Sequence, residues 1–473
     1  MRKHTAAGSL VEEFDGADLG DQRRAERLKL IAGQLEQEPA KGFPRALGSD
    51  AALEAFYRFI NNDAFSAADI LAPHLAATMK RATGAGPVIA VHDTTLVQFS
   101  TDRAGLGVTS GHGKFGFVAH MSLLLTERDG LPLGVGHLET LTRTGKKWTK
   151  RKRQGQRGYV HADDDGRESL RWVRGVDAIA GPELEVVHVT DAEGDFFELL
   201  EHLGSRNSRF VIRAGQLDRS VVCEDQDRSL REVATHIRRK ASRTIELSER
   251  KHVPRAAKSK QRRHPNRSAR SARISIGAAR IAVAGTRYSK LRDGIELNVV
   301  RVWEPNPPEH EPAVEWVLLT TEPVTTPSDL LRVVDVYRKR WVIEEYFKAL
   351  KSGCSFEKRQ IESYAALRKV LSLFAPIAYR LLFLRALERQ QSTRPARFAF
   401  CEADLELMQR APSNRALAPP RTIGDALTHL ARLGGHLRNN GPPGWQTLSW
   451  GYEKLLAMRL GYEIAMAEKC DQS

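Results

Sequence analysis

The stretch SDLLRVVDVYRKRWVIEEYFKALK, residues 328–351, decides how the rest of the chain is interpreted. Thr326 is a good N-cap residue, Pro327 suits the first helical position, and Asp329 adds negative charge to the first turn. Gly353 provides a natural end. Apolar residues recur at helical spacing, namely Leu330, Val333, Val334, Trp341 and Phe347. The pattern predicts one long helix from Ser328 to Lys351.

One face of this predicted helix carries Tyr337, Arg340, Glu344 and Lys351. At about 100° per residue, their spacing places all four within an arc of roughly 60°. A carboxylate flanked by cations is most often a solvated ladder of ion pairs. The alternative is a metal-binding carboxylate beside groups that hold phosphate. The helix alone favours the ladder, and the rest of the chain reverses that preference.

The composition favours a polyanionic partner. The 473 residues carry a net charge of +15, and the pI is near 9.7. Nucleic acid fits this excess first and an anionic membrane surface second. The basic residues are spread over several segments rather than one amphipathic face, which disfavours the membrane.

Compartment and membrane signals agree with a cytoplasmic protein. The N-terminus lacks the apolar run of a signal peptide. No apolar stretch is long enough to span a bilayer, since the best one, 370–379, is interrupted by Arg380. The four cysteines lie far apart, which favours a reducing compartment and argues against a zinc site.

Residues 1–70 are predicted to form a helical, basic DNA-binding unit. Three arginines lie on one side of an apolar face in LGDQRRAERLKLI. The arginines are Arg23, Arg24 and Arg27, and the apolar residues are Leu28, Leu30 and Ile31. Such a face suits contact with a DNA backbone. An ordinary solvated helix explains the same pattern equally well.

From residue 71 to residue 375 the pattern is that of a mixed α/β domain. Strands are predicted at 87–93 (ending at Asp93), 116–127, 132–141, 184–190 (running into Asp191) and 209–214 (ending near Arg213), with helices at 167–180 and 195–204. Asp129-Gly130 is a hairpin turn signal. Helical crossovers between the later strands favour helices packed on a mixed sheet. This is the order of the ribonuclease-H-like fold.

Two further regions complete the predicted organisation. Residues 214–322 form a β-rich insertion with a flexible basic loop at 250–273. Residues 376–473 form a helical C-terminal domain. Its last helix carries apolar residues (Trp450, Leu455 and Tyr462) that suit either core packing or a dimer contact.

Two aspartates at strand ends and a glutamate on a later helix match the ligands of a two-metal phosphoryl-transfer site. Carboxylate and water are the ligands that Mg²⁺ and Mn²⁺ prefer. Two such ions activate a water or a 3′-hydroxyl and stabilise the leaving oxygen. An aspartate after a strand is also a common turn residue. Asp93, Asp191 and Glu344 together are therefore far more specific than any one of them.

The chain resembles the bacterial cut-and-paste DDE transposases, most closely those of the transposon-five (insertion-sequence-fifty) type. The family's Y-x2-R-x3-E-x6-K signature appears in YRKRWVIEEYFKALK, and HDTT and TDAEGD match its two aspartate motifs. The segments LGDQRRAERL, YRFINN, WVLLTTEPV and ARLGG also match. The similarity spans nearly the whole chain.

The resemblance implies a role for each matching residue. Asp93, Asp191 and Glu344 would bind two Mg²⁺ ions, with Mn²⁺ as a substitute. Tyr337, Arg340, Lys351 and Arg213 would hold the phosphate at the 5′ side of the cut. Trp316 would stack on a flipped base, with a strand-core tryptophan as the alternative. Lys348 and Trp341 would contact DNA or support the helix, and Arg23, Arg24 and Arg27 would read the transposon end.

The resemblance also implies the reaction and the assembly. A DNA-bound homodimer would nick the transposon end, form a hairpin, open it and join the 3′-hydroxyl to target DNA. Two alternatives stay open: a structure-specific Mg²⁺-dependent nuclease, and a domesticated DNA-binding protein without catalysis. The nuclease would not need Trp316 or the phosphate-holding residues. The silent protein would be expected to lack one of the three carboxylates.

Overall fold

The computed structural model describes residues 10–110, 114–143, 168–181, 183–249, 266–283, 294–390, 393–437, 443 and 445–471. The chain divides into two compact units. The first unit combines Met1–Glu185 with Trp341–Ser473, and the second unit is the continuous segment Val186–Arg340. Among the described residues both units contain helices and strands, in agreement with the predicted α/β class.

The first unit is a β-sheet surrounded by helices. Its N-terminal part contains η1 (Leu10–Phe14), α1 (Gln22–Gln37), α2 (Phe43–Leu47), α3 (Asp50–Ile60), α4 (Ala67–Ala85), β1 (Val88–Phe99), β2 (Gly107–Ser110), β3 (Lys114–Thr126), β4 (Pro132–Leu141) and α5 (Leu170–Asp177). Its C-terminal part contains α9 (Trp341–Lys348), η3 (Ala349–Gly353), η4 (Phe356–Lys358), α10 (Tyr364–Gln390), η5 (Ala396–Phe398), α11 (Glu402–Arg410), η6 (Pro412–Asn414), α12 (Ile423–Leu433) and α13 (Trp445–Asp471).

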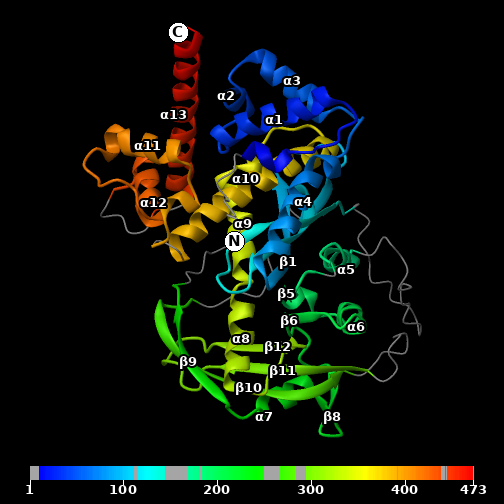
Figure 1. The fold of residues 1–473 in the computed structure, drawn as a ribbon. Coiled ribbons are helices and arrows are strands. Elements are labelled where there is room, and N and C mark those ends of the chain that lie inside the picture. Colours follow the sequence, from blue (N-terminus) through cyan, green and yellow to red (C-terminus); the bar gives the residue numbers. More distant parts are fainter. Residues whose placement is uncertain are drawn as a thin grey trace. The chain divides into compact units, whose positions relative to one another are not determined.

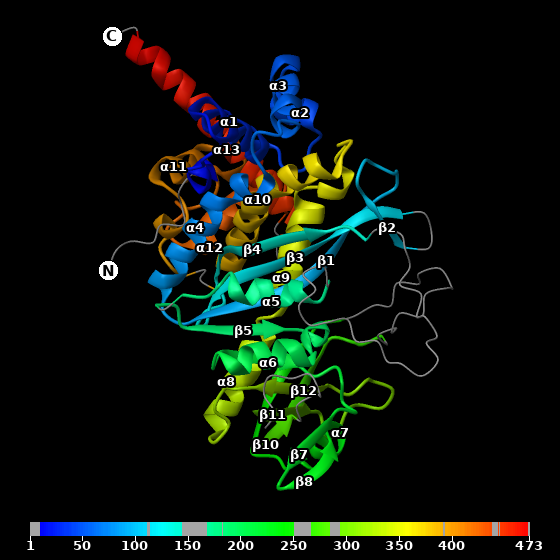
Figure 2. The same ribbon diagram turned by 90° about the vertical axis from the view of Figure 1, so that its right-hand side faces the viewer.

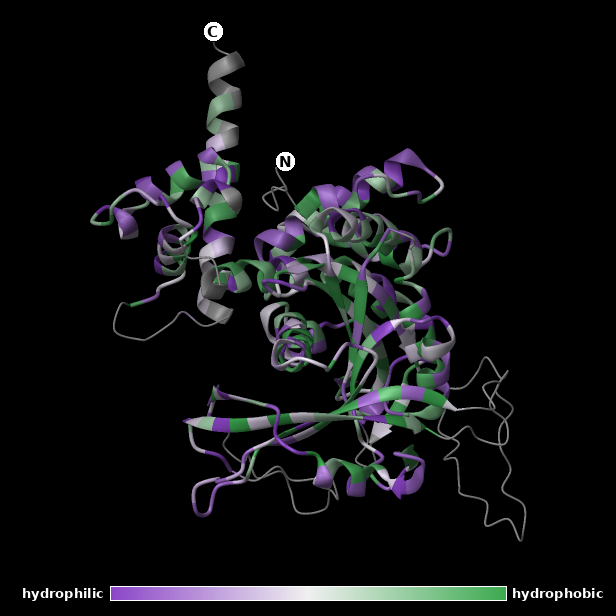
Figure 3. Cartoon of the chain, turned by 60° about the horizontal axis from the view of Figure 1, so that its bottom comes forward, coloured by the Kyte–Doolittle hydropathy of each residue, from purple (hydrophilic) through white to green (hydrophobic). Residues whose placement is uncertain are grey.

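Strand β3 is the centre of the sheet in this unit. β1 pairs with one side of it in antiparallel register, and β4 and the short β2 pair with the other side. Nearly every residue of β3 is buried, and Figure 3 shows the long runs of hydrophobic residues along the strands. Helix α5 packs on β3 and β4 and lies over the sheet in Figure 2.

The α10 region corrects one prediction. The sequence was expected to contain no membrane-length apolar segment, yet Tyr364–Leu387 is long and apolar enough to qualify in spite of Arg380. Its most apolar window is 89% buried inside the structure, where α10 packs against α4, β4 and α12. Such burial is the behaviour of a core helix.

A buried polar cluster ties η1 to the sheet. The Glu13 carboxylate accepts hydrogen bonds from Nδ1 of His74 at 2.6 Å and from Arg81 at 2.7 Å. Nε2 of His74 accepts the backbone N–H of Val135 at 3.1 Å. Burial by itself raises the pKa of Glu13, but His74 and Arg81 outweigh it and lower the pKa to about 2.

Replacing Glu13 with glutamine is therefore expected to destabilise the first unit at neutral pH. Because the folded-state pKa lies below the usual 4.5, the carboxylate contributes stability above about pH 4.5, and this contribution fades as the pH falls toward 2. The shift corresponds to about 3 kcal/mol. Hydrogen exchange of the backbone amides of α4 and β4, in the variant and the wild type at pH 7 and pH 3, measures this loss of stability. The difference between variant and wild type should shrink at pH 3, and an equal difference at both values would contradict the assignment.

The strands of the second unit pair in a mixed arrangement. Its elements are β5 (Val186–Thr190), η2 (Ala192–Gly194), α6 (Phe197–Ser205), β6 (Arg209–Arg213), β7 (Ser220–Cys223), β8 (Gln226–Ser229), α7 (Leu230–His236), β9 (Ala241–Leu247), β10 (Arg270–Val283), β11 (Ile295–Trp303), β12 (Glu315–Thr320) and α8 (Pro327–Arg338). The strand order is β5-β6-β12-β11-β10-β7-β8, with β9 also on β10. β5 and β6 are parallel, and the other pairs are antiparallel (Figure 1).

The predicted order of strands and helices is confirmed, with three corrections. β1 does not end at Asp93 but continues to Phe99, because the whole strand pairs with β3 and because Thr95, Val97 and Phe99 are buried. The short strands β2, β7 and β8 and the helices α7 and α11 were not predicted. The end of the basic tract, from Arg270, is part of β10 rather than a loop, while 250–265 lie outside the described residues.

The predicted single helix over 328–351 is also wrong. Its start is as predicted, since Thr326 and Asp329 form a capping box and Pro327 is the first residue of α8. The α-helix ends at Arg338, and a new helix, α9, begins at Trp341. Between them Arg340 N–H bonds to the carbonyl of Tyr337 at 3.0 Å, a tighter three-residue spacing. Beyond α9 the chain continues as a π-helical segment, η3.

Candidate functional site

Asp191 lies where the sequence places it, directly after β5. Its side chain accepts the backbone N–H of Glu193 at 2.9 Å and so caps the short helix η2. The carboxylate is half-buried. A strand followed at once by a capped turn therefore holds this side chain in a fixed place at the strand end.

Asp195 anchors the same turn, and the sequence analysis gave it no role. Its carboxylate is buried and accepts the backbone N–H groups of Gly215 and Gln216 at 2.7 and 2.8 Å. It also pairs with Arg219 at 2.6 Å. A Cβ at Gly215 would lie 2.9 Å from the carbonyl oxygen of Ala192, so the approach requires glycine. The second aspartate of TDAEGD was the available signal.

Arg213, Trp316 and Tyr337 form one group beside Asp191. Arg213 is the last residue of β6, its guanidinium lies close enough to the Tyr337 hydroxyl to lower the pKa of that phenol, and the ring centres of Trp316 and Tyr337 are 5.8 Å apart. Burial raises the pKa of Tyr337, while the charges of Arg213 and Arg340 lower it and that of Asp191 raises it further. The second unit therefore gathers five of the residues named from the sequence.

The accessibility of this group is uneven. Tyr337 is only 6% exposed, whereas Trp316 and Arg340 are half-buried. Trp316 lies on β12 opposite Val302, and Leu318, two residues further along the same strand, pairs with Arg213 on β6. The side chains around Tyr337 therefore cover most of its phenol ring, whereas Trp316 keeps part of its surface exposed to solvent.

Asp93 and Glu344 belong to the first unit. Asp93 lies within β1 opposite Met121, and its Oδ1 accepts the backbone N–H of Thr94 at 2.7 Å. Glu344 is in the first turn of α9, which contacts β1. Both carboxylates are half-buried. Each of the two residues therefore keeps part of its surface exposed.

The predicted stripe on a single helix face does not exist as such. Tyr337 is on α8, Arg340 lies in the break, Glu344 is on α9 and Lys351 is in the π-helical segment η3. Lys351 donates to the carbonyl of Leu96 on β1 at 2.5 Å and lies 3.4 Å from the carboxylate of Glu357. It therefore ties η3 to β1.

Trp341 and Lys348 share the exposed side of α9. Trp341 is 52% exposed rather than packed, contrary to its predicted place on the apolar surface of the helix. The Lys348 ammonium lies 5.6 Å from the centre of its ring, a cation–π contact. The pair is available for contact with a partner.

The N-terminal arginines differ in exposure. Arg23 is 88% exposed and pairs with Asp21 at 2.9 Å, and Arg27 is exposed as well. Arg24 is half-buried and donates to the carbonyl of Leu19 at 2.8 Å. Leu30 is 51% exposed and not part of the apolar face, which corrects the prediction for α1.

No metal cluster is present within the part of the chain that the structure describes, in the sense of three or more His, Cys, Asp or Glu side chains grouped to hold an ion. Asp93 and Glu344 come from the first unit and Asp191 from the second. Each unit by itself therefore supplies only part of a three-carboxylate set. The chemistry of that set, oxygen ligands on half-buried side chains, suits a hard divalent cation.

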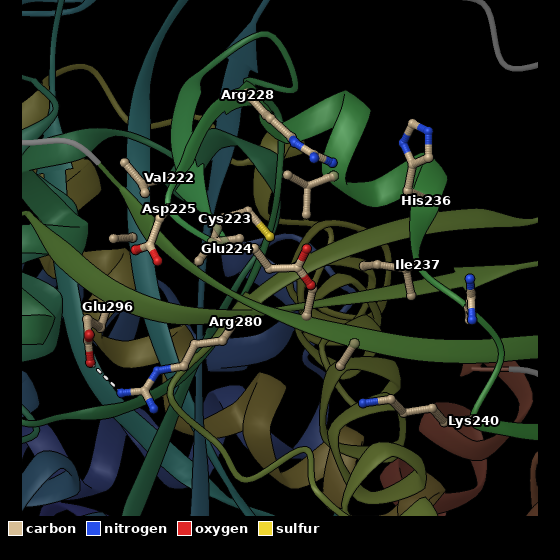
Figure 4. Close-up of a pocket in the computed structure, with 16 residues that line it drawn as sticks. Val222, Cys223, Glu224, Asp225, Arg228, His236, Ile237, Lys240, Arg280 and Glu296 are labelled. Carbon is tan, nitrogen blue, oxygen red and sulfur yellow. Dashed lines mark hydrogen bonds and ion pairs between the residues drawn. The ribbon is translucent and has the colours of Figure 1, made fainter.

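A cavity of about 970 Å³ in the second unit contains none of the residues named from the sequence. The β7–β8 turn, the end of α7 and β10 line it. Figure 4 shows Arg280 paired with Glu296 on one side, Arg228 and His236 on another, and the carboxylates of Glu224 and Asp225 between them. Charges of both signs line it, and no residue of the group around Asp191 is among its lining residues, so the two are distinct.

Two comparisons with known families match this chain. Residues 7–65 match the family described as Transposase DNA-binding. Residues 172–375 match the family described as Transposase DDE domain, a range that includes Asp191 and Glu344 but begins after Asp93. Together the two matches cover more than half of the chain. Both matches are to transposase domains, and the chain belongs to the DDE transposases.

Proposed function

We propose that this transposase binds inverted repeats at the ends of a DNA element, excises the element and inserts it into target DNA. The observation that carries the proposal is the DDE match over 172–375, in which Asp191, Arg213, Trp316, Tyr337 and Arg340 belong to one compact unit. The DNA-binding match over 7–65 and the net charge of +15 support it.

The domain plan goes with this function. The proposed catalytic domain is a ribonuclease-H-like core at 71–375 with a β-rich insertion at about 214–322. A helical DNA-binding domain at 1–70 precedes it, and a helical domain at 376–473 mediates dimerisation. A homodimer would bring two ends together in the bacterial cytoplasm, where the nucleoid supplies target DNA.

Asp93, Asp191 and Glu344 would hold two Mg²⁺ ions, with Mn²⁺ as a substitute. When bound, the ions supply activation of a water or hydroxyl and stabilisation of the leaving oxygen. The chain's own residues bind and orient the DNA. Arg213 and Arg340 pair with the phosphate beside the cut, and the Tyr337 hydroxyl donates a hydrogen bond to it. Lys351 would leave Glu357 to join them.

The DNA steps are two hydrolyses and two transfers. Water breaks the P–O3′ bond of one strand at the element end, and the freed 3′-hydroxyl attacks the opposite strand and closes a hairpin. A second water opens the hairpin, and the 3′-hydroxyl then attacks target DNA. Each transfer exchanges one phosphodiester bond for another, so no energy source is needed.

Incubation of the protein with its element ends and Mg²⁺ tests this function. Hairpin-ended fragments are expected, seen on denaturing gels as slowly migrating strands in which the two DNA strands of the end stay covalently joined. Plain nicks without hairpins would favour the structure-specific nuclease. Binding without any cleavage, in Mg²⁺ or Mn²⁺, would favour a catalytically silent DNA-binding protein.

Replacing Trp316 with alanine is expected to slow hairpin formation more than first-strand nicking. Stacking of a base on an aromatic ring is worth roughly 1–3 kcal/mol, so the hairpin step should slow about 5- to 150-fold. Single-turnover assays resolve the two steps. Trp303→Ala is the matched control, because Trp303 is a half-buried tryptophan on the neighbouring strand β11 and its ring lies against Arg301. Equal slowing of both steps by Trp316→Ala would count against base stacking.

A further inference from the structure

A layer of hydrogen-bonded side chains lies on the face of β1 opposite Asp93. Side chains alternate along a strand, so His92 and Thr94 point away from the face that carries Asp93. Each meets its direct cross-strand partner on β3: His92 faces Ser122, and Thr94 faces His120. Nδ1 of His92 lies 2.7 Å from the Ser122 hydroxyl, and Nδ1 of His120 lies 3.0 Å from the Thr94 hydroxyl.

Helix α5 covers this layer, and in Figure 2 it lies in front of the strands β3 and β4 that it contacts. Arg171 is only 8% exposed, and its Nε donates to the Thr94 hydroxyl at 3.1 Å. The ring of Trp172 lies 4.7 Å from that of His120. A Cβ at Gly175 would be 3.0 Å from Nε2 of His120, so glycine allows the helix to approach this closely. The Thr94 hydroxyl is thus held from two elements.

The same threonine holds the catalytic carboxylate on the other face. The backbone N–H of Thr94 donates to Oδ1 of Asp93 at 2.7 Å. Any rotation of the peptide between the two residues would move the Thr94 side chain away from His120 and Arg171. Fixing the hydroxyl therefore fixes the N–H that orients the carboxylate.

If the layer served only to pack the core, its polar side chains would make the folded state less stable than apolar side chains would. Burying polar groups costs free energy that hydrogen bonds only partly return, and an apolar core would be as stable or more so. Burial holds the pKa of His120 well below its usual value, and the charges of Arg171 and His137 add to this effect. Arg171 remains the cation of the layer, with the carbonyl of Glu168 accepting from it at 2.7 Å.

We propose that Thr94, His120 and Arg171 act as positioning residues that set the orientation of the Asp93 carboxylate for a divalent metal ion. The inference rests on the proposed function, because it takes Asp93 as a metal ligand. Residues that orient the ligands of a metal typically change its affinity 10- to 100-fold when they are altered. In this proposal none of the three is a ligand of the ion.

The test measures Mn²⁺ binding to the full-length protein by the electron paramagnetic resonance signal of free Mn²⁺. Thr94→Val removes the hydroxyl at nearly constant volume and is expected to weaken binding about tenfold. Thr94→Ser keeps the hydroxyl and should bind Mn²⁺ with an affinity close to that of the wild type. Thr140→Val is the control, because it removes a threonine hydroxyl from β4 of the same sheet, where Tyr364 bonds it at 2.8 Å.

A second readout separates positioning from folding. In nicking assays, Thr94→Val should raise the Mg²⁺ concentration for half-maximal rate while the rate at saturating Mg²⁺ stays near the wild-type value. Arg171→Met provides a second variant with the same expected shift if Thr94→Val reduces the yield of folded protein.

The outcomes are distinguishable. Wild-type Mn²⁺ affinity in folded Thr94→Val and Arg171→Met, with weak binding in Asp93→Asn, would overturn the positioning role alone. Mn²⁺ affinity that does not depend on Asp93 would overturn the proposed metal site, and the positioning role with it.

Discussion

Replacing Asp191 with asparagine is expected to abolish DNA strand cleavage while leaving binding to transposon-end DNA intact. Asparagine is as good a cap as aspartate, so it can still accept the Glu193 N–H that now bonds to Asp191 at 2.9 Å. The loss is therefore the negative charge rather than the turn. Metal-assisted stabilisation is worth several kcal/mol, so the nicking rate should fall at least about 10³-fold.

Single-turnover nicking with radiolabelled ends, together with fluorescence anisotropy for end binding, checks this result. Asp218→Asn is the matched control: it lies in the same unit, is 84% exposed and pairs only at the surface with Arg231. It should leave both measurements unchanged. An Asp191→Asn protein that still cuts at more than a few per cent of the wild-type rate would remove Asp191 from the proposed catalytic set.

Replacing Asp195 with alanine is expected to cause the largest loss of stability in the second unit. The change leaves Arg219, whose side chain is only 10% exposed, without its carboxylate partner, and it strips the acceptor from two backbone N–H groups. Removing one partner of a buried ion pair costs about 3–5 kcal/mol. The end of β6 should then loosen, and cleavage should fall because Arg213 is the residue at that end.

Hydrogen exchange measured by mass spectrometry over residues 209–219 tests this prediction directly. A local readout is preferable because unfolding of a chain with two units need not be a single transition. Asp218→Ala removes an exposed ion pair from the same segment and should cost at most about 1 kcal/mol. Unchanged protection of 209–219 in Asp195→Ala would mean that the buried pair contributes little there.

Several strands and turns of this protein could be predicted from the sequence, because local sequence patterns and tertiary packing favour the same structure there. The apolar segments 116–127 and 132–141 around Asp129-Gly130 became β3 and β4, and the capping box at Thr326 began α8. The predicted strand end at Asp93 was wrong, because a polar residue inside an apolar run suggests that the strand ends there. Pairing with β3 carries β1 six residues further, and only the tertiary structure contains that information.

The break between α8 and α9 could not be predicted from the sequence, because local helix propensity and packing disagree there. Lys339 and Arg340 are good helix formers, and neither glycine nor proline marks the position. The break coincides with the boundary between the two units, so packing rather than propensity decides it.

The sequence could have identified some of the residues on the face of β1 opposite Asp93, but not all of them. Alternation from Asp93 places His92 and Thr94 on the opposite face of the strand, and the motif HDTT contains both. What alternation cannot show is that His120, 26 residues further along the chain, and Arg171, on α5, reach the same hydroxyl. Likewise Asp195 stood in a quoted motif, but its partners at 215–219 follow an intervening helix and strand.

The interrupted first unit has a consequence during protein synthesis. The second unit is one continuous segment and can fold as it leaves the ribosome, whereas β1 waits for α9, which is translated about 250 residues later. At typical elongation rates of about 5–20 residues per second, that delay is roughly 13–50 s. Asp93 and Asp191 are therefore synthesised long before Glu344, and a nascent chain that has not reached α9 lacks one of the three carboxylates of the proposed metal site.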